Sequence, residues 1–174
     1  MLNKVEREWI KRGKSNPNII NYLYGEIIDH QKVIDELGID ENSVVLDIGV
    51  GKGTFLTNLI ITAGCKGIGI EPVEDRYVEF LQLIKKHKLE NKIESHKKHY
   101  PCPITLKPTH IILHACAFRK RLCAKIYDAL PHGVKILHNS LSLKRYAHDD
   151  KNNRIKIKTS YLRKEGTHFW IHEK

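Results

Sequence analysis

A run of β-branched and apolar residues that breaks into glycines constrains the fold of this chain more than any other segment. The run covers residues 43–48, glycines follow at Gly49, Gly51 and Gly53, and an amphipathic stretch covers residues 55–63. This order predicts a buried strand, a tight turn and the start of a helix. Glycines allow positive φ angles and a close approach to the main chain, and the first turn of a helix presents unpaired N–H groups. We therefore expect a ligand at this turn.

The spacing of the glycines and two acidic residues indicate the kind of ligand. The dinucleotide fingerprint G-x-G-x-x-G would need a glycine where Thr54 stands. Asp47 precedes the glycines, where it would repel a pyrophosphate but suit the ammonium group of an amino acid. A second strand-like segment, residues 66–70, leads into Glu71, about twenty residues after Gly51, an offset typical of a carboxylate that binds a ribose. An ammonium group plus a ribose describes S-adenosylmethionine (SAM). The alternative is a plain glycine turn with two incidental acids.

Length and composition are typical of one globular domain. The chain has 174 residues, of which 41% are hydrophobic and 29% charged. No apolar run approaches the roughly 20 residues that span a bilayer. The N-terminal segment carries Glu6 and Glu8 without an apolar core, unlike a signal or transit peptide. We expect a cytoplasmic or nuclear protein that is not secreted.

Cysteine and histidine spacing gives no sign of a metal. The four cysteines show no C-x-x-C pairing, which favours free thiols in a reducing compartment. The eleven histidines are scattered without ligand spacing. We therefore expect no metal site.

The positive charge of the chain favours an anionic partner. The formal net charge is +10 at pH 7, which suits nucleic acid or a nucleoprotein; we expect no membrane partner. A basic surface without a partner is the alternative. Two candidate surfaces are predicted: Lys85, Lys86, Lys88, Lys97, Lys98 and residues 119–121 for the first, and Lys144, Arg145, Lys151, Arg154, Lys156 and Lys158 for the second.

Strand and helix patterns alternate along the chain. A basic amphipathic helix is expected within residues 1–18, packed on a single domain of residues 19–174. The further expected helices are residues 19–37, 55–62, 73–87 and 118–130, and the strands are residues 43–48, 66–70, 92–97, 109–115, 133–138, 154–161 and 167–172. The alternation predicts a mainly parallel sheet with right-handed crossovers. The last two strands are expected to form an antiparallel hairpin at the sheet edge.

The glycine motif and this order of elements resemble the class I SAM-dependent methyltransferases over nearly the whole chain. The resemblance implies an α/β, Rossmann-like fold with helices on both faces of the sheet. Three local features resemble a narrower group: Tyr24-Gly25-Glu26 ahead of the glycine turn, Ala117-Phe118 after the fourth strand, and the terminal Phe169-Trp170-Ile171-His172. The group is the histone lysine methyltransferases without a SET domain, the disruptor-of-telomeric-silencing type, and their small archaeal relatives.

The resemblance implies a set of cofactor-binding residues: Glu26, Asp47, Gly49, Gly51, Gly53 and Glu71. Glu26 would contact the methionine end of SAM, Asp47 its amino group, and Glu71 its ribose. An exposed helix-surface charge is the alternative interpretation of Glu26, and helix–strand packing is that of Gly53. In the family, an acidic residue after the third strand often binds the adenine amino group, but residues 95–98 of this chain include no acid. Backbone groups and His96 or Tyr100 are therefore the candidates to hold adenine.

The acceptor side departs from the family, because His114-Ala115-Cys116 stands in place of an Asn-Asn-Phe segment. Strand-end groups are expected to wall the acceptor channel: His114, His138, Asn139, Phe169 and Trp170. Among them, His114, Asn139 and Trp170 are the candidate catalytic residues. His114 would take a proton from the acceptor amine or accept its hydrogen bond. A core histidine is the alternative.

The implied reaction is lysine N-methylation of a histone-like or other basic protein, possibly within a nucleoprotein. Two alternatives stay open. One is methylation of RNA or DNA, although the Asn/Asp-Pro-Pro-aromatic motif typical of N6-adenine and N4-cytosine enzymes is missing after the fourth strand. The other is a non-catalytic module that binds SAM or nucleic acid.

Overall fold

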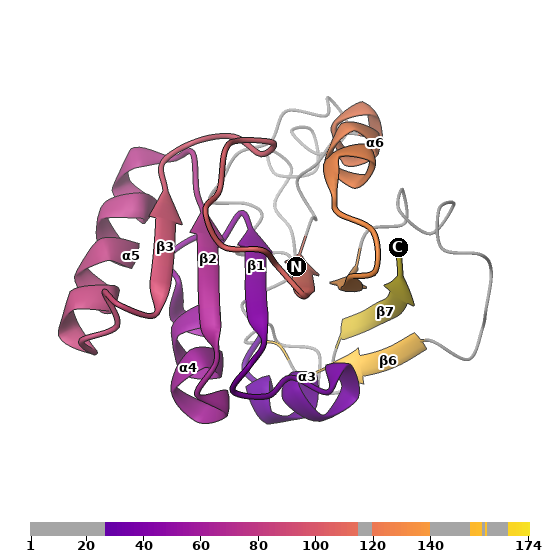
Figure 1. The fold of residues 1–174 in the computed structure, drawn as a ribbon, viewed down its shortest axis with the longest axis horizontal. Helices are drawn as coiled ribbons and strands as arrows, with labels where there is room; N and C mark the ends of the chain where they lie inside the picture. Colours follow the sequence, from indigo (N-terminus) through magenta and orange to yellow (C-terminus); the bar gives the residue numbers. More distant parts are fainter. Residues whose placement is uncertain (1–26, 115–119, 140–153, 158, 160–166) are drawn as a thin grey trace, which may run out of the picture.

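The computed structural model describes residues 27–114, 120–139, 154–157, 159 and 167–174 (Figure 1). The expected N-terminal helix and Glu26 lie outside these residues, as does the segment 115–119. Within the described part, no helix is long and apolar enough to cross a membrane.

Four helices and seven strands are described. The helices are α3 (His30–Leu37), α4 (Thr54–Ala63), α5 (Glu74–Lys86) and α6 (Lys120–Ala129). The strands are β1 (Val44–Ile48), β2 (Lys66–Ile70), β3 (Ile93–His96), β4 (His110–Leu113), β5 (Lys135–His138), β6 (Arg154–Ile157) and β7 (Thr167–Glu173). Most predicted elements are confirmed within a few residues of their expected ends.

The strands form one sheet in the order β3-β2-β1-β4-β5-β7-β6. The strands from β3 to β5 in this order run parallel to one another, whereas β7 runs antiparallel to both β5 and β6. The hairpin therefore joins the sheet through β7, and β6 forms the edge (Figure 1). This confirms the predicted mainly parallel sheet with a C-terminal antiparallel hairpin.

Two apolar clusters cover the two faces of the sheet. The first, which we call the α4 face, contains Leu37 of α3, Leu56 of α4 and Phe80 of α5, packed on residues such as Val45. The second, the α6 face, contains Ile126 of α6 and other residues packed on neighbouring strand positions such as Leu46 and Ile111. Successive strand residues alternate between the faces, because the side-chain period of a strand is two. Helices thus cover both faces, as predicted.

The helix expected over residues 19–37 is wrong at residues 27–29. Ile27 forms an antiparallel bridge with Thr159, and Ile28, expected to face inward, is 54% exposed. The helix begins at His30 because the side chain of Asp29 accepts a hydrogen bond from the Lys32 N–H and caps it.

Helix α5 approaches the sheet closely because two glycines lie against Phe80. A Cβ atom on Gly53 would lie 2.0 Å from the Phe80 ring, and one on Gly69 would lie 2.4 Å from it. Phe80 itself is fully buried. The absence of side chains at these two positions therefore sets how the end of the glycine turn packs on α5.

Replacing Gly53 with alanine should destabilise the protein by roughly 2–4 kcal/mol, because the residue has φ +81° and its new methyl group would overlap Phe80. Gly51→Ala is the matched control. It also has a positive φ, +61°, but a Cβ there would meet no atom within 4 Å, so its cost should be only about 1 kcal/mol. Urea denaturation measures both; equal costs would show that packing on Phe80 does not constrain Gly53.

Candidate functional site

Two buried carboxyl groups lie where neighbouring strands β1 and β2 end. Asp47 is 5% exposed and Glu71, directly after β2, is 3% exposed. Burial, together with the negative charge of Glu71, raises the pKa of Asp47 to about 7. No described residue donates a hydrogen bond to the Asp47 carboxyl group. Among residues 27–114, 120–139, 154–157, 159 and 167–174, nothing supplies this carboxyl group with the cation or donors that normally accompany a buried charge.

Glu71 holds the glycine turn in place. Its Oε2 accepts a hydrogen bond from the Gly51 N–H (3.0 Å), and its Oε1 accepts one from the Val73 N–H (2.8 Å). The N–H groups of Gly49 and Val50 both donate to the carbonyl of Ile70 (2.8 and 3.1 Å). The end of β2 thus fixes the turn after β1. Each carboxylate oxygen has two acceptor sites, so Glu71 can still accept hydrogen bonds from ligand hydroxyls.

The three glycines of the turn serve different purposes. All have positive φ angles: 83° at Gly49, 61° at Gly51 and 81° at Gly53. Gly51 faces open space, which leaves its main chain accessible to a ligand, whereas Gly53 packs on Phe80. Helix α4 starts directly after Gly53 without a side-chain cap. The packing interpretation of Gly53 therefore has direct structural support.

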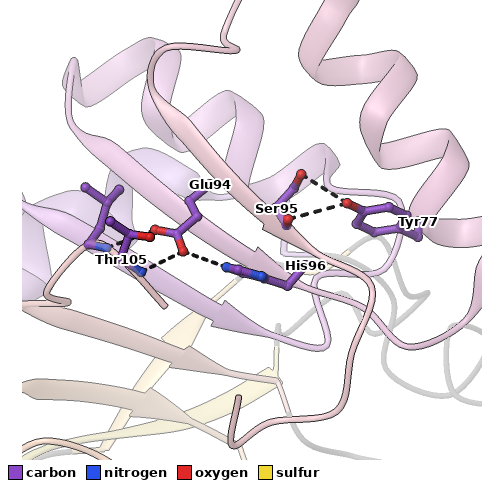
Figure 2. A network of polar contacts seen from close by, with 6 residues as sticks. Tyr77, Glu94, Ser95, His96 and Thr105 are labelled. Atoms are coloured by element: carbon purple, nitrogen blue, oxygen red, sulfur yellow. Dashed lines mark hydrogen bonds and ion pairs between the residues drawn. The ribbon is translucent and has the colours of Figure 1, made fainter. Parts of the chain in front are cut away.

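A polar network secures the segment that follows β3 (Figure 2). Glu94 Oε1 accepts a hydrogen bond from the Thr105 N–H (2.7 Å) and lies 2.6 Å from His96 Nε2, and Oε2 accepts one from the Leu106 N–H (2.9 Å). Burial alone would raise the pKa of Glu94, but these three partners together hold it below its usual value. Sequence reasoning did not identify Glu94; its position two residues before His96 in a strand was the available signal.

The two residues expected near adenine have different surroundings. The Tyr100 hydroxyl donates to the Ala129 carbonyl (3.0 Å) and its side chain is buried in the cluster on the α6 face. His96 is half-buried, and its carbonyl accepts a hydrogen bond from the Glu71 N–H (3.0 Å). Of the two, His96 therefore lies beside the acidic pair, and Tyr100 anchors its loop to the end of α6.

His114 directly follows β4, and its ring lies 5.4 Å from that of Phe169. Asp47 is in register with Ile112, two residues before His114, and both Ile112 and Phe169 belong to the cluster on the α4 face. Burial lowers the pKa of His114 to about 4, so its ring is neutral at physiological pH. His114 therefore lies on the side of the sheet that carries Asp47.

Trp170 lies on the other side of the sheet. It is in register with His138, and the two rings stack at 5.7 Å with an interplanar angle of 22°. His138 is in register with Leu113, which belongs to the cluster on the α6 face. The structure thus brings His114 and Phe169 together but places His138 and Trp170 across the sheet from them. Asn139 directly follows β5 and is half-buried, with its Oδ1 atom enclosed.

The first predicted basic surface is divided between the two ends of α5. Lys85 and Lys86 are in the last turn of the helix and Lys88 follows it. Lys97 contacts Glu74, the first residue of the helix. Thirteen helical residues span about 20 Å, so these lysines do not form one patch. Within the described ranges, no three His, Cys, Asp or Glu side chains are grouped so that they could hold a metal ion.

Several solved structures of methyltransferases match this chain in fold. No family model and no curated protein matches the chain. The C-terminal domain of precorrin-6Y C5,15-methyltransferase from Rhodobacter capsulatus matches with a TM-score of 0.61 and 17% identity, over 83% of this chain and 88% of that one. An RNA methyltransferase from Salinibacter ruber, solved with S-adenosyl-L-homocysteine, matches with a TM-score of 0.64 and 18% identity, over 83% of this chain and 88% of that one. A tRNA (m1A58) methyltransferase from Aquifex aeolicus matches with a TM-score of 0.60 and 14% identity, over 89% and 74%. The chain therefore has the fold of these methyltransferases, which confirms the predicted fold class.

Asp47→Asn should stabilise the ligand-free protein at pH 8. The carboxyl group has a pKa of about 7 when folded and 3.8 in its reference state, so the wild type loses stability as pH rises from about 4 through 7. An amide at this position does not titrate. The gain should be on the order of 4 kcal/mol at pH 8 and below about 1 kcal/mol at pH 4.

Asp40→Asn is the control for this prediction, because hydrogen bonds led by that from Ser43 lower the pKa of Asp40. That change should therefore destabilise the protein at pH 8. Thermal unfolding at both pH values measures the effects. An Asp47→Asn protein that is no more stable than wild type at pH 8 would show that Asp47 is not a strained, uncompensated charge.

Proposed function

We propose that this chain binds SAM where β1 and β2 end and that it is a SAM-dependent methyltransferase. The observation that carries the proposal is the buried carboxyl group of Asp47, to which no described residue donates a hydrogen bond. An α-ammonium group would supply both a positive charge and charge-assisted donors. The likeness in fold to methyltransferases, one of them solved with S-adenosyl-L-homocysteine, supports the same ligand.

The surrounding residues fit the other parts of that ligand. The open side of Gly51 lets the main chain approach it, and the free acceptor sites of Glu71 suit the ribose hydroxyls. Bound SAM supplies an electrophilic methyl group, so alignment of the acceptor contributes most of the acceleration. The protein's task is then to orient the ligand, exclude water and position the acceptor.

The surroundings of His114 support a proposal for the acceptor class. The family resemblance implies lysine, whose ammonium group has a pKa of about 10.4 and must lose a proton before it attacks. His114, with a pKa of about 4, is a poor base for that step. A nucleobase ring nitrogen that carries no proton, such as N1 of adenine, is uncharged at neutral pH and needs no base before attack. His114 and the net charge of +10 thus favour a nucleic-acid acceptor, with a protein lysine as the second candidate.

Replacing either acid should weaken SAM binding while leaving the protein folded. Asp47→Asn and Glu71→Gln each remove a charged hydrogen-bond partner worth about 1.5–3 kcal/mol, so the dissociation constant should rise at least tenfold. Asp40→Asn, an exposed acid before β1, should change it less than twofold. Isothermal titration calorimetry measures these dissociation constants. Heat of binding with NAD and none with SAM would contradict the proposal.

The acceptor is identified by incubation with SAM labelled in its methyl group and separate pools of RNA, DNA, core histones, nucleosomes and other basic proteins. We expect label in nucleic acid, and nuclease-resistant label in protein would select lysine instead. Label in no pool would support the non-catalytic alternative.

With a productive pool, His114→Ala should not remove an ionisation between pH 6 and 8 from the rate profile, because the histidine is already neutral there. Loss of such an ionisation in the variant would show that His114 acts as the base, and would return the proposal to an amine acceptor.

A further inference from the structure

One face of the β6–β7 hairpin is basic and aromatic, and the proposed SAM site does not use it. Strand register and alternation place Arg154, Lys156, His168 and Trp170 together on the α6 side of the sheet; we call this set the hairpin face. Arg154 and Lys156 are exposed, whereas His168 and Trp170 are half-buried. The guanidinium carbon of Arg154 lies 5.9 Å from the centre of the Trp170 ring.

The charge of the hairpin face has one sign. The only acidic residue in the two strands is Glu173, which is in register with Lys135 and alternates to the opposite side of the sheet. Helix α6 covers the neighbouring part of this side as far as His172, whose ring stacks on Tyr127 at 5.7 Å. A cationic, partly aromatic surface therefore begins where the cover of α6 ends.

The Trp170 ring is held in a fixed orientation. His138, fully buried, stacks on it at 5.7 Å, and Arg154 lies over it. Because His138 on β5 and Arg154 on β6 lie on opposite sides of Trp170 on β7, a flat partner can stack on the ring only where the exposed Arg154 side chain moves aside. The buried His138 continues to support the other face of the ring, so the ring itself loses little conformational freedom. Nucleobases offer such a flat partner, and the adjacent Arg154 and Lys156 suit the phosphates that follow each base.

The hairpin face also borders the edge of the sheet at which β4 and β5 end, where His114 lies. Trp170 is opposite His138, the last residue of β5, and β7 runs antiparallel to β5. Residues 167–169 therefore continue past the carboxyl end of β5, where Phe169 contacts His114 on the other side of the strand. A chain bound along the hairpin face is thus adjacent to the edge at which the parallel strands end.

We infer that the hairpin face binds single-stranded nucleic acid: a base stacks on Trp170 in the place of the Arg154 guanidinium, which moves to a phosphate, and Lys156 holds a second phosphate. This would make it the docking surface for a nucleic-acid acceptor and in that respect rests on the proposed function. The binding itself requires no SAM, so it is measured separately. A single strand is specified because the bases of a duplex are not free to stack on a side chain.

The test measures fluorescence anisotropy of the full chain with labelled 12-nucleotide oligouridine, oligothymidine and a duplex of equal length. Trp170→Ala should weaken single-strand binding about tenfold or more, and Trp170→Phe should keep it within about threefold, because a phenyl ring still stacks. In a Trp9→Phe background, which leaves Trp170 as the single tryptophan, binding should quench the tryptophan fluorescence.

The charge contribution has a matched control. Arg154→Ala with Lys156→Ala should reduce the slope of log affinity against log salt by about 1.4, or 0.7 for each lost phosphate contact. Lys85→Ala with Lys86→Ala removes the same charge from exposed residues at the end of α5 and should leave the slope nearly unchanged. Circular dichroism and thermal unfolding verify that each variant is folded.

Three results would overturn the inference: equal losses for the two double variants, unchanged binding by Trp170→Ala, or binding of an acidic peptide in place of the oligonucleotides. The proposed function fails by a different result, the absence of SAM binding in calorimetry of the wild type. If the protein binds oligonucleotides as predicted but does not bind SAM, the inference about the hairpin face stands and the proposed methyltransferase function is refuted.

Discussion

The site depends on a pair of carboxyl groups that the fold buries at the ends of two neighbouring strands. Burial shields Asp47 from water, and the negative charge of Glu71 repels its own; together they raise the pKa of Asp47 to about 7. An uncompensated buried charge reduces stability, and such charges are concentrated at functional sites. The arrangement is therefore understood most simply as one half of an interaction, completed by a cation. That requirement, more than the glycines themselves, is the reason for proposing SAM rather than a dinucleotide as the ligand.

The remaining structure keeps this pair rigid. Glu71 accepts hydrogen bonds from the main chain of Gly51 and Val73, so the turn after β1 and the start of α5 share one anchor. Phe80 fills the space left by Gly53 and Gly69 and locks α5 against the same turn. The groups proposed to bind the ligand thus lie at strand ends and in a packed turn. Alignment of a ligand on such a frame requires little further ordering of the chain.

Sequence reasoning predicted the sheet, the hairpin and the position of the two acids at strand ends, because each has a local signal: alternation, glycine spacing and the end of an apolar run. It missed Glu94 because two of its partners, Thr105 and Leu106, are on a loop whose path the sequence does not reveal. It also grouped Trp170 with His114, which lie on opposite sides of the sheet. That separation depends on a shift of one residue in register, which reverses the face of every side chain in a strand.

The central claim is that Asp47 receives the ammonium group of SAM, and proton release measures it directly. With a pKa of about 7, the ligand-free carboxyl group is about three-quarters protonated at pH 6.5 and must lose that proton to pair with a cation. Calorimetric titrations with SAM at pH 6.5, in two buffers of different ionisation enthalpy, should show release of roughly 0.7 proton per SAM bound. At pH 8 the sign should reverse to a net uptake of about 0.5 proton, because the free α-amino group, with a pKa of about 7.8, is by then mostly deprotonated and must gain a proton to pair with Asp47. SAM binding without proton release at pH 6.5 would contradict the account.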